Sequence, residues 1–175
     1  MSELYGVSID RIVKDDDECN ISLHNVTDID IDEGVKFLIC AKQKTYSGYG
    51  VETKSSRVES HDLKYEEGNY MYYDTYLGGQ NFSGEEAIWF NENPIWCMNY
   101  SGRVLEEKFS GDFLKEVLHH VPYEMPYRGP AIYQKGDYNY HCKVDGEFIW
   151  YRGYEEIFYL DKKIYEGYFH GGIVK

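Results

Sequence analysis

The sequence predicts an α+β protein in which a helix is followed by an antiparallel meander of four strands, and in which this unit occurs twice (αββββ twice). Residues 84–104 repeat without a gap at residues 153–173, an offset of 69. Aromatic, glycine, glutamate and isoleucine positions match between the copies: Gly84/Gly153, Glu86/Glu155, Ile88/Ile157, Trp89/Phe158, Phe90/Tyr159, Ile95/Ile164, Trp96/Tyr165, Tyr100/Phe169 and Gly102/Gly171. A repeat of this kind indicates a duplicated structural unit before any single residue is interpreted.

The N-terminal segment, residues 1–29, shows only short alternation of apolar residues around the acidic run at 15–18. We expect a hairpin with an acidic turn or a loose leader there.

A first helix is predicted over residues 30–43. Ile31, Val35, Leu38 and Lys42 fall on one stripe at helical spacing. Acidic residues gather at the start of this segment and lysines at its end, which complements the helix dipole. Gly34 weakens the helix by about 1 kcal/mol relative to alanine.

A second helix is predicted over residues 111–121. Ser110 is a suitable N-cap, and Pro122 ends the helix because proline cannot donate to the helical hydrogen bonds. One face of this segment is apolar, formed by Phe113, Leu114, Val117, Leu118 and Val121.

Short strands with alternating residues follow each helix. We expect strands at 60–65, 69–77, 82–91 and 94–101 in the first half, and at 130–134, 137–144, 147–160 and 163–170 in the second. Asp145-Gly146 has the composition of a two-residue hairpin turn. The next turn is predicted at 92–94 in one copy and at 161–163 in the other. The matched tyrosines Tyr70 and Tyr138 differ by 68, so a one-residue slip lies near Gly78-Gly79 in one copy and near Asp145-Gly146 in the other.

The two helices are expected on one face of the sheet, where they would cover the apolar surface of antiparallel strands. No linker separates the repeat halves, about 30–104 and 105–175. Residues 30–175 are therefore predicted to form one pseudo-symmetric α+β domain.

The net charge of −13 disfavours direct binding to nucleic acid or to an anionic membrane surface, and it leaves a basic protein or a cationic ligand as partners.

The four cysteines have no CxxC spacing, and no apolar run approaches the ~20 residues of a membrane span. The simplest expectation is a reduced cytoplasmic protein. The six histidines have no metal-ligand spacing, so we expect no metal and no cofactor. Oligomeric state is not encoded in any of these features.

Several segments together resemble a known family. They are TYSGYG at 45–50, Arg57, SHDLKY at 60–65, YYDTYLGG at 72–79, FSGEE at 82–86 and PIWCMNYSG at 94–102. Over about residues 30–172 the chain resembles a bacterial and archaeal family of uncharacterised domains, some of which follow a helix-turn-helix module in XRE-type regulators. The resemblance implies a ligand- or partner-sensing role and no catalytic residues. Residues 1–29 are too short and too acidic for such a module, so a regulatory role would require a separate DNA-binding protein.

Glu86 and Glu155 are the candidate catalytic residues. Each shares strand parity with aliphatic and aromatic residues, so burial would raise the pKa of its carboxyl group unless an arginine compensates. Two such carboxylates facing one cleft could divide into acid and base. The structural alternative is that each glutamate is bound by an arginine such as Arg57 or Arg128.

Candidate ligand-binding residues lie on two other strands. Asp74 shares a face with tyrosines, and Trp96 and Tyr100 share one parity while Asn99 points the other way. Aromatic rings with a nearby acid and amide could stack a sugar or base, or cage a cation. Ordinary sheet packing is the alternative. Arg57 and Arg128 complete the predicted binding set.

Three functions remain open from the sequence. The first is a non-enzymatic sensor domain that binds a small molecule or a partner between the halves. The family resemblance would link such a domain to transcriptional regulation. The second is a small hydrolase or isomerase that uses the paired glutamates. The third is an acidic protein that neutralises a basic partner.

Overall fold

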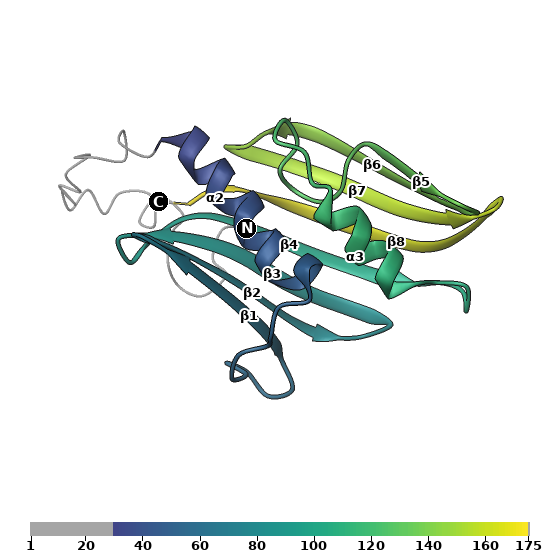
Figure 1. The fold of residues 1–175 in the computed structure, drawn as a ribbon, viewed down its shortest axis with the longest axis horizontal. Coiled ribbons are helices and arrows are strands. Elements are labelled where there is room, and N and C mark those ends of the chain that lie inside the picture. Colours follow the sequence, from purple (N-terminus) through teal and green to yellow (C-terminus); the bar gives the residue numbers. More distant parts are fainter. Residues whose placement is uncertain (1–29, 175) are drawn as a thin grey trace, which may run out of the picture.

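One eight-stranded antiparallel sheet forms the body of the structure (Figure 1). The computed structural model describes residues 30–174, so the expected hairpin or leader at 1–29 lies outside the described residues. The spatial order of the strands is β1-β2-β3-β4-β8-β7-β6-β5. The strands are β1 (His61–Glu67), β2 (Tyr70–Gly78), β3 (Asn81–Phe90), β4 (Asn93–Val104), β5 (Ile132–Lys135), β6 (Tyr138–Glu147), β7 (Trp150–Tyr159) and β8 (Lys162–Ile173).

The two halves meet at the centre of the sheet, where β4 pairs with β8. Tyr100 lies directly opposite Phe169, and these residues are also equivalents in the sequence repeat. An antiparallel pair places a residue opposite its own equivalent only at a local two-fold axis, so the axis that relates the halves passes between Tyr100 and Phe169. The predicted fold, a helix plus an antiparallel meander occurring twice, is confirmed.

The halves also share their irregularities. The register between β3 and β4 shifts after Ile88, and the register between β7 and β8 shifts after the equivalent Ile157. Asn91 and Leu160, another equivalent pair, have positive φ angles of 48° and 53°. The hairpin turns after β3 and β7 therefore begin at Asn91 and Leu160, one residue earlier than the predicted ranges 92–94 and 161–163. In each turn the residue after the strand takes the left-handed conformation of a tight hairpin.

The prediction of a hairpin turn at Asp145-Gly146 is wrong. Both residues lie inside β6, where Asp145 is opposite Arg152 and accepts hydrogen bonds from its guanidinium. The strands continue to Glu147 and Trp150, so the turn is made by the two residues between them. Gly146 keeps a positive φ of 103° within the strand, a conformation that glycine adopts without a steric penalty.

Two helices precede the two meanders, α2 (Ile31–Lys44) and α3 (Gly111–His119). The Asp30 carboxylate caps α2 by accepting from the backbone N–H of Asp32, and the Ser110 hydroxyl caps α3 by accepting from Phe113. A 3₁₀ turn, η1 (Tyr46–Gly48), follows α2. The helices agree with the predicted ranges, except that α3 ends at His119, two residues before the predicted end.

Both helices lie against the same face of the sheet (Figure 1). Their buried residues pack with the inward-facing residues of the strands in one hydrophobic core. Aromatic rings make up much of this core, including Tyr72, Trp96, Tyr140, Tyr151 and Tyr165, all at most 2% exposed. Between residues 30 and 174 there is no helix with the length and apolar character needed to cross a membrane.

Candidate functional site

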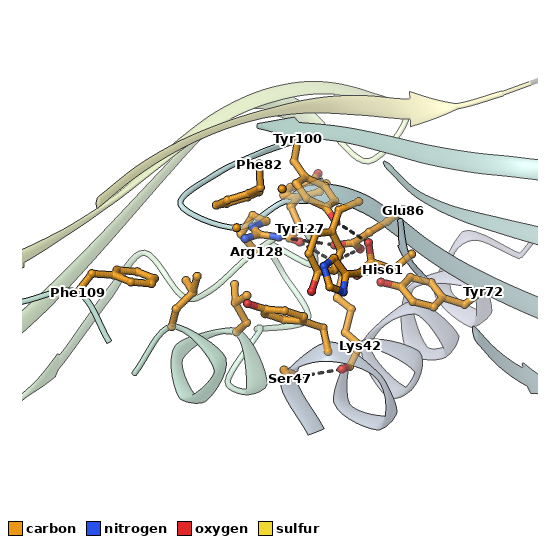
Figure 2. Close-up of a pocket in the computed structure, with 17 residues that line it drawn as sticks. Lys42, Ser47, His61, Tyr72, Phe82, Glu86, Tyr100, Phe109, Tyr127 and Arg128 are labelled. Atoms are coloured by element: carbon orange, nitrogen blue, oxygen red, sulfur yellow. Dashed lines mark hydrogen bonds and ion pairs between the residues drawn. The ribbon is translucent and has the colours of Figure 1, made fainter. Parts of the chain in front are cut away.

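A cavity of about 320 Å³ lies between the helices and the first half of the sheet (Figure 2). Lys42 from α2, Ser47 from η1 and Leu118 from α3 form one side of it. The opposite side is formed by strands β1 to β4. The complete lining is Lys42, Tyr46, Ser47, His61, Tyr72, Asp74, Tyr76, Gly78, Gly79, Phe82, Glu86, Tyr100, Phe109, Leu114, Leu118, Tyr127 and Arg128.

A buried ion pair joins α2 to the sheet beside this cavity. The ammonium group of Lys42 contacts the Glu86 carboxylate and also donates a hydrogen bond of 2.8 Å to the backbone carbonyl of Tyr127. Burial lowers the pKa of Lys42 by more than the Glu86 carboxylate raises it. The lysine thus has two oxygen partners in a site that water reaches poorly.

Arg128 connects the two repeat-equivalent glutamates. Its Nη2 and Nε donate to Glu155 Oε1 over 2.8 and 3.1 Å, and its Nη1 lies 3.7 Å from Glu86 Oε1. The guanidinium carbon is 5.3 Å from the centroid of the Tyr100 ring, a cation–π distance. A single buried cation therefore serves both halves of the molecule.

Glu155 is fully bound and does not line the cavity. Besides Arg128, the hydroxyl groups of Tyr140 and Tyr165 each donate to it over 2.7 Å. Burial acts to raise the pKa of Glu155, but Arg128 and these hydrogen bonds outweigh burial and hold the pKa below its ordinary value. This carboxylate is ionised and structural in character.

Asp74 has a different environment. The Tyr100 hydroxyl donates to Asp74 Oδ1 over 2.6 Å, and within residues 30–174 no other hydrogen bond reaches this carboxyl group. Burial, followed by the charge of Glu86 on the neighbouring strand, raises the pKa of Asp74 to about 7. Asp74 is thus a cavity-lining carboxyl group that exchanges its proton near neutral pH.

The second half differs at the corresponding place. Cys142 stands where the first half has Asp74, and it lies opposite Glu155 as Asp74 lies opposite Glu86. Burial raises the pKa of the Cys142 thiol to about 12, so the thiol stays protonated at neutral pH.

Four of the predicted site residues come together at the cavity: Asp74, Glu86, Tyr100 and Arg128. The other four do not line it. Trp96 is buried in the core, where it stacks on Phe148 at 5.5 Å. Asn99 lines a hollow that includes Lys143 and His170, on the opposite face of the sheet. Arg57 donates to the Thr75 hydroxyl at an exposed position.

Sequence reasoning missed Lys42 as a site residue. The available signal was its place on the apolar stripe of the first helix, with Leu38 and Val35, where a lysine requires a buried partner. His61, Tyr72 and Tyr127 were also not predicted, and no local pattern distinguishes them from other aromatic residues of this chain.

No group of three or more His, Cys, Asp or Glu side chains within residues 30–174 could hold a metal ion. In comparisons with known proteins, residues 74–174 match the family described as a domain of unknown function, DUF5680. No curated protein and no solved structure matches the chain.

Proposed function

The chain belongs to the DUF5680 family of domains of unknown function, and from the geometry of its cavity we propose that it is a non-enzymatic domain that binds a small polar molecule. The match covers the strands β3 to β8 and most of β2, and it therefore includes Asp74, Glu86 and Arg128. The family description assigns no activity, so the proposal depends on the site alone.

The observation that carries the proposal is the Asp74 carboxyl group at the cavity wall. Only one hydrogen bond from the described residues reaches it, although the two oxygens of an ionised carboxylate can accept about four. The surrounding wall is aromatic, with Tyr72, Tyr76 and Phe82 on the strands. A mostly apolar cavity with a few converging polar groups is typical of a small-molecule site.

A sensor role follows from where this ligand would lie. It would contact Lys42 on α2 and Leu118 on α3 as well as the sheet, so occupancy would add contacts between helices and strands. The resemblance to domains that accompany helix-turn-helix modules supports a link to transcriptional regulation. This link is part of the proposal.

A thermal-shift screen with small metabolites, sugars and amines tests the proposal, since a ligand that binds only the folded state raises the melting temperature. Phe109→Trp adds volume to the cavity wall and should abolish the shift caused by a hit. Phe148→Trp is the matched control, because Phe148 stacks on Trp96 outside the cavity and should leave the shift intact. No shift across a broad panel, or an unchanged shift in Phe109→Trp, would count against the proposal.

A second candidate function is a small hydrolase or isomerase, and one observation changes which pair of acids it would use. Glu155 does not open onto the cavity, whereas Asp74 and Glu86 are direct cross-strand neighbours that both line it. Asp74 with a pKa of about 7 could donate a proton, while Glu86 beside Lys42 could act as the base or nucleophile. Turnover of glycosides or keto sugars that is lost in both Asp74→Asn and Glu86→Gln would favour this candidate over simple binding.

A further inference from the structure

We propose that the ligand of this cavity is a small organic cation, a molecule with an ammonium group that binds the Asp74 carboxylate and an apolar body that packs on the surrounding aromatic rings. This inference rests on the proposed function, because it names the chemical class of the molecule that the cavity binds.

The first argument is the charge balance of the buried cluster. Two cations, Lys42 and Arg128, face three carboxylates, Asp74, Glu86 and Glu155. All five residues are buried. When every group is ionised, the cluster has one negative charge in excess. An uncompensated buried charge is costly, so the cluster either takes up a proton or receives a cation from outside.

The excess charge falls on Asp74. Lys42 is engaged by Glu86 and by the Tyr127 carbonyl, and Arg128 is engaged by both glutamates. From residues 30–174, Asp74 receives a hydrogen bond only from the Tyr100 hydroxyl, on Oδ1. Among the described residues its Oδ2 has no hydrogen-bond donor, and the residue lines the cavity. The position at which a ligand cation would neutralise the cluster is therefore Asp74.

The second half of the molecule provides an internal comparison. There the equivalent of Asp74 is Cys142, which is neutral, and Glu155 is satisfied by Arg128 and two tyrosine hydroxyls. None of the residues at that place, Cys142, Tyr140 or Glu155, lines the cavity. The additional carboxylate and the cavity thus occur together in one half and are both missing from the matched position in the other.

The walls also suit an organic cation. The negative faces of aromatic rings attract cations, and this attraction adds to the apolar contact of the rest of the molecule. The cavity volume of about 320 Å³ lies at the lower end of the ~300–1,000 Å³ that is usual for small-molecule sites. Tyr72, Tyr76, Phe82 and Tyr100 on the strands present aromatic rings to the cavity.

An anionic ligand fits less well, because Lys42 and Arg128 would have to leave their carboxylates to bind it. A cation requires no such rearrangement and needs only that Asp74 lose its proton. The titratable and charged groups that face Asp74 are Lys42 on α2, Tyr46 on η1, His61 on β1, Tyr72 and Tyr76 on β2, Glu86 on β3, Tyr100 on β4 and Arg128 after α3.

Three probes of nearly equal shape test this inference: 2-phenylethylamine, 2-phenylethanol and phenylacetate. Calorimetric titration of the full chain at pH 8 should give the tightest binding for the amine, by about tenfold or more over the alcohol. Since the pKa of Asp74 is about 7, the affinity for the amine should fall about tenfold between pH 8 and pH 6, and binding should release a proton at pH 6.

Two variants sharpen the result. Asp74→Asn should abolish the preference for the amine and retain binding of the alcohol. Glu166→Gln is the control, because it removes a carboxylate that is bound by Arg103 and Lys163 outside the cavity and should leave the preference unchanged. If Asp74→Asn does not fold, the pH dependence of the unmodified protein still decides the question.

The failures are distinguishable. Equal or tighter binding of the alcohol or of phenylacetate by the unmodified protein would overturn the cation inference and leave the proposed binding function in place. Binding of the amine without any dependence on pH between 6 and 8 would also overturn the inference. Absence of binding for all three probes, together with an empty thermal-shift screen, would overturn the proposed function and the inference with it.

Discussion

Glu86 and Glu155, which stand at equivalent positions in the two halves of the chain, are joined through one guanidinium group, that of Arg128. Arg128 comes from the segment that follows α3 and has no counterpart in the repeat. The duplicated sheet therefore places two acids symmetrically, and one unsymmetrical residue contacts both of them, while Lys42 supplies a second cation at Glu86. This contact decides that Glu155 is a structural residue and that Glu86, with Asp74, remains at the cavity.

Removing this cation should be strongly destabilising. We expect Arg128→Met to lower the free energy of unfolding by about 3–5 kcal/mol, because it leaves the buried Glu155 carboxylate without a cation and removes one of the two cations beside Glu86. Urea denaturation measures the change. The matched control is Arg103→Met, which breaks an ion pair with Glu166 whose arginine is largely exposed and should cost at most about 1 kcal/mol. Similar losses in the two variants would contradict the role given to Arg128.

The stability of the protein should depend on the protonation of Asp74. Its pKa is raised from 3.8 to about 7, so between these values the folded protein holds a proton that the unfolded chain has released. The free energy of unfolding should therefore decrease as the pH rises from about 4 to 7, by up to about 1.4 kcal/mol per pH unit, and then level off.

Asp74→Asn should remove this dependence. Subtracting the variant's unfolding free energy from that of the unmodified protein at pH 5, 6, 7 and 8 isolates the contribution of Asp74 from that of other groups. A difference that stays constant over this range would show that Asp74 titrates at its ordinary pKa.

Two buried tyrosines should respond oppositely to loss of the hydroxyl group. The Tyr151 hydroxyl has no hydrogen-bond partner among residues 30–174, whereas the Tyr140 hydroxyl donates to Glu155 and accepts from the Gly129 N–H. Tyr151→Phe should be neutral or stabilising by about 1–2 kcal/mol, and Tyr140→Phe should be destabilising by about 1–3 kcal/mol. Thermal or chemical denaturation of both variants checks this, and a larger loss in Tyr151→Phe would refute the assignment.

Close packing near the two-fold axis should make position 153 intolerant of any side chain larger than that of glycine. A Cβ atom there would lie 2.1 Å from the ring of Phe169, the residue opposite it on β8. We expect Gly153→Ala to destabilise the protein by about 1–3 kcal/mol, and Phe169→Leu to recover part of the loss in the double variant. Gly111→Ala, where a Cβ meets no atom within 4 Å, should be neutral or slightly stabilising. Strictly additive effects of the Gly153 and Phe169 changes would argue against this contact.

Much of the fold could be predicted because its signals are local. The Ser110 cap, the alternating tyrosines after Tyr70 and the apolar face of the second helix each depend on residues close together in the chain. One local signal was ambiguous. Asp145-Gly146 has the composition of a turn, but a glycine with positive φ is also found inside strands, and β6 continues past Gly146 to Glu147.

The candidate site was predictable only in part. Asp74, Glu86 and Tyr100 could be found because strand parity puts them on the face that carries the aliphatic and aromatic residues. Lys42 could not be assigned to Glu86, since 44 residues separate them and only the packing of α2 on the sheet brings them together. Parity also placed Trp96 with Tyr100, but the cavity ends before Trp96, where the rings of Phe148 and Tyr151 fill the space.

The sequence by itself determined the duplication and most of the helices and strands, because periodicity and a fixed offset are carried by the order of residues along the chain. It also contained the difference between Asp74 and Cys142. Only the tertiary structure decided that this difference lies at a cavity, that Arg128 binds both glutamates, and that a single hydrogen bond from the described residues reaches Asp74. Such features depend on how side chains from distant segments fill the space between helices and sheet, and no local sequence pattern encodes this packing.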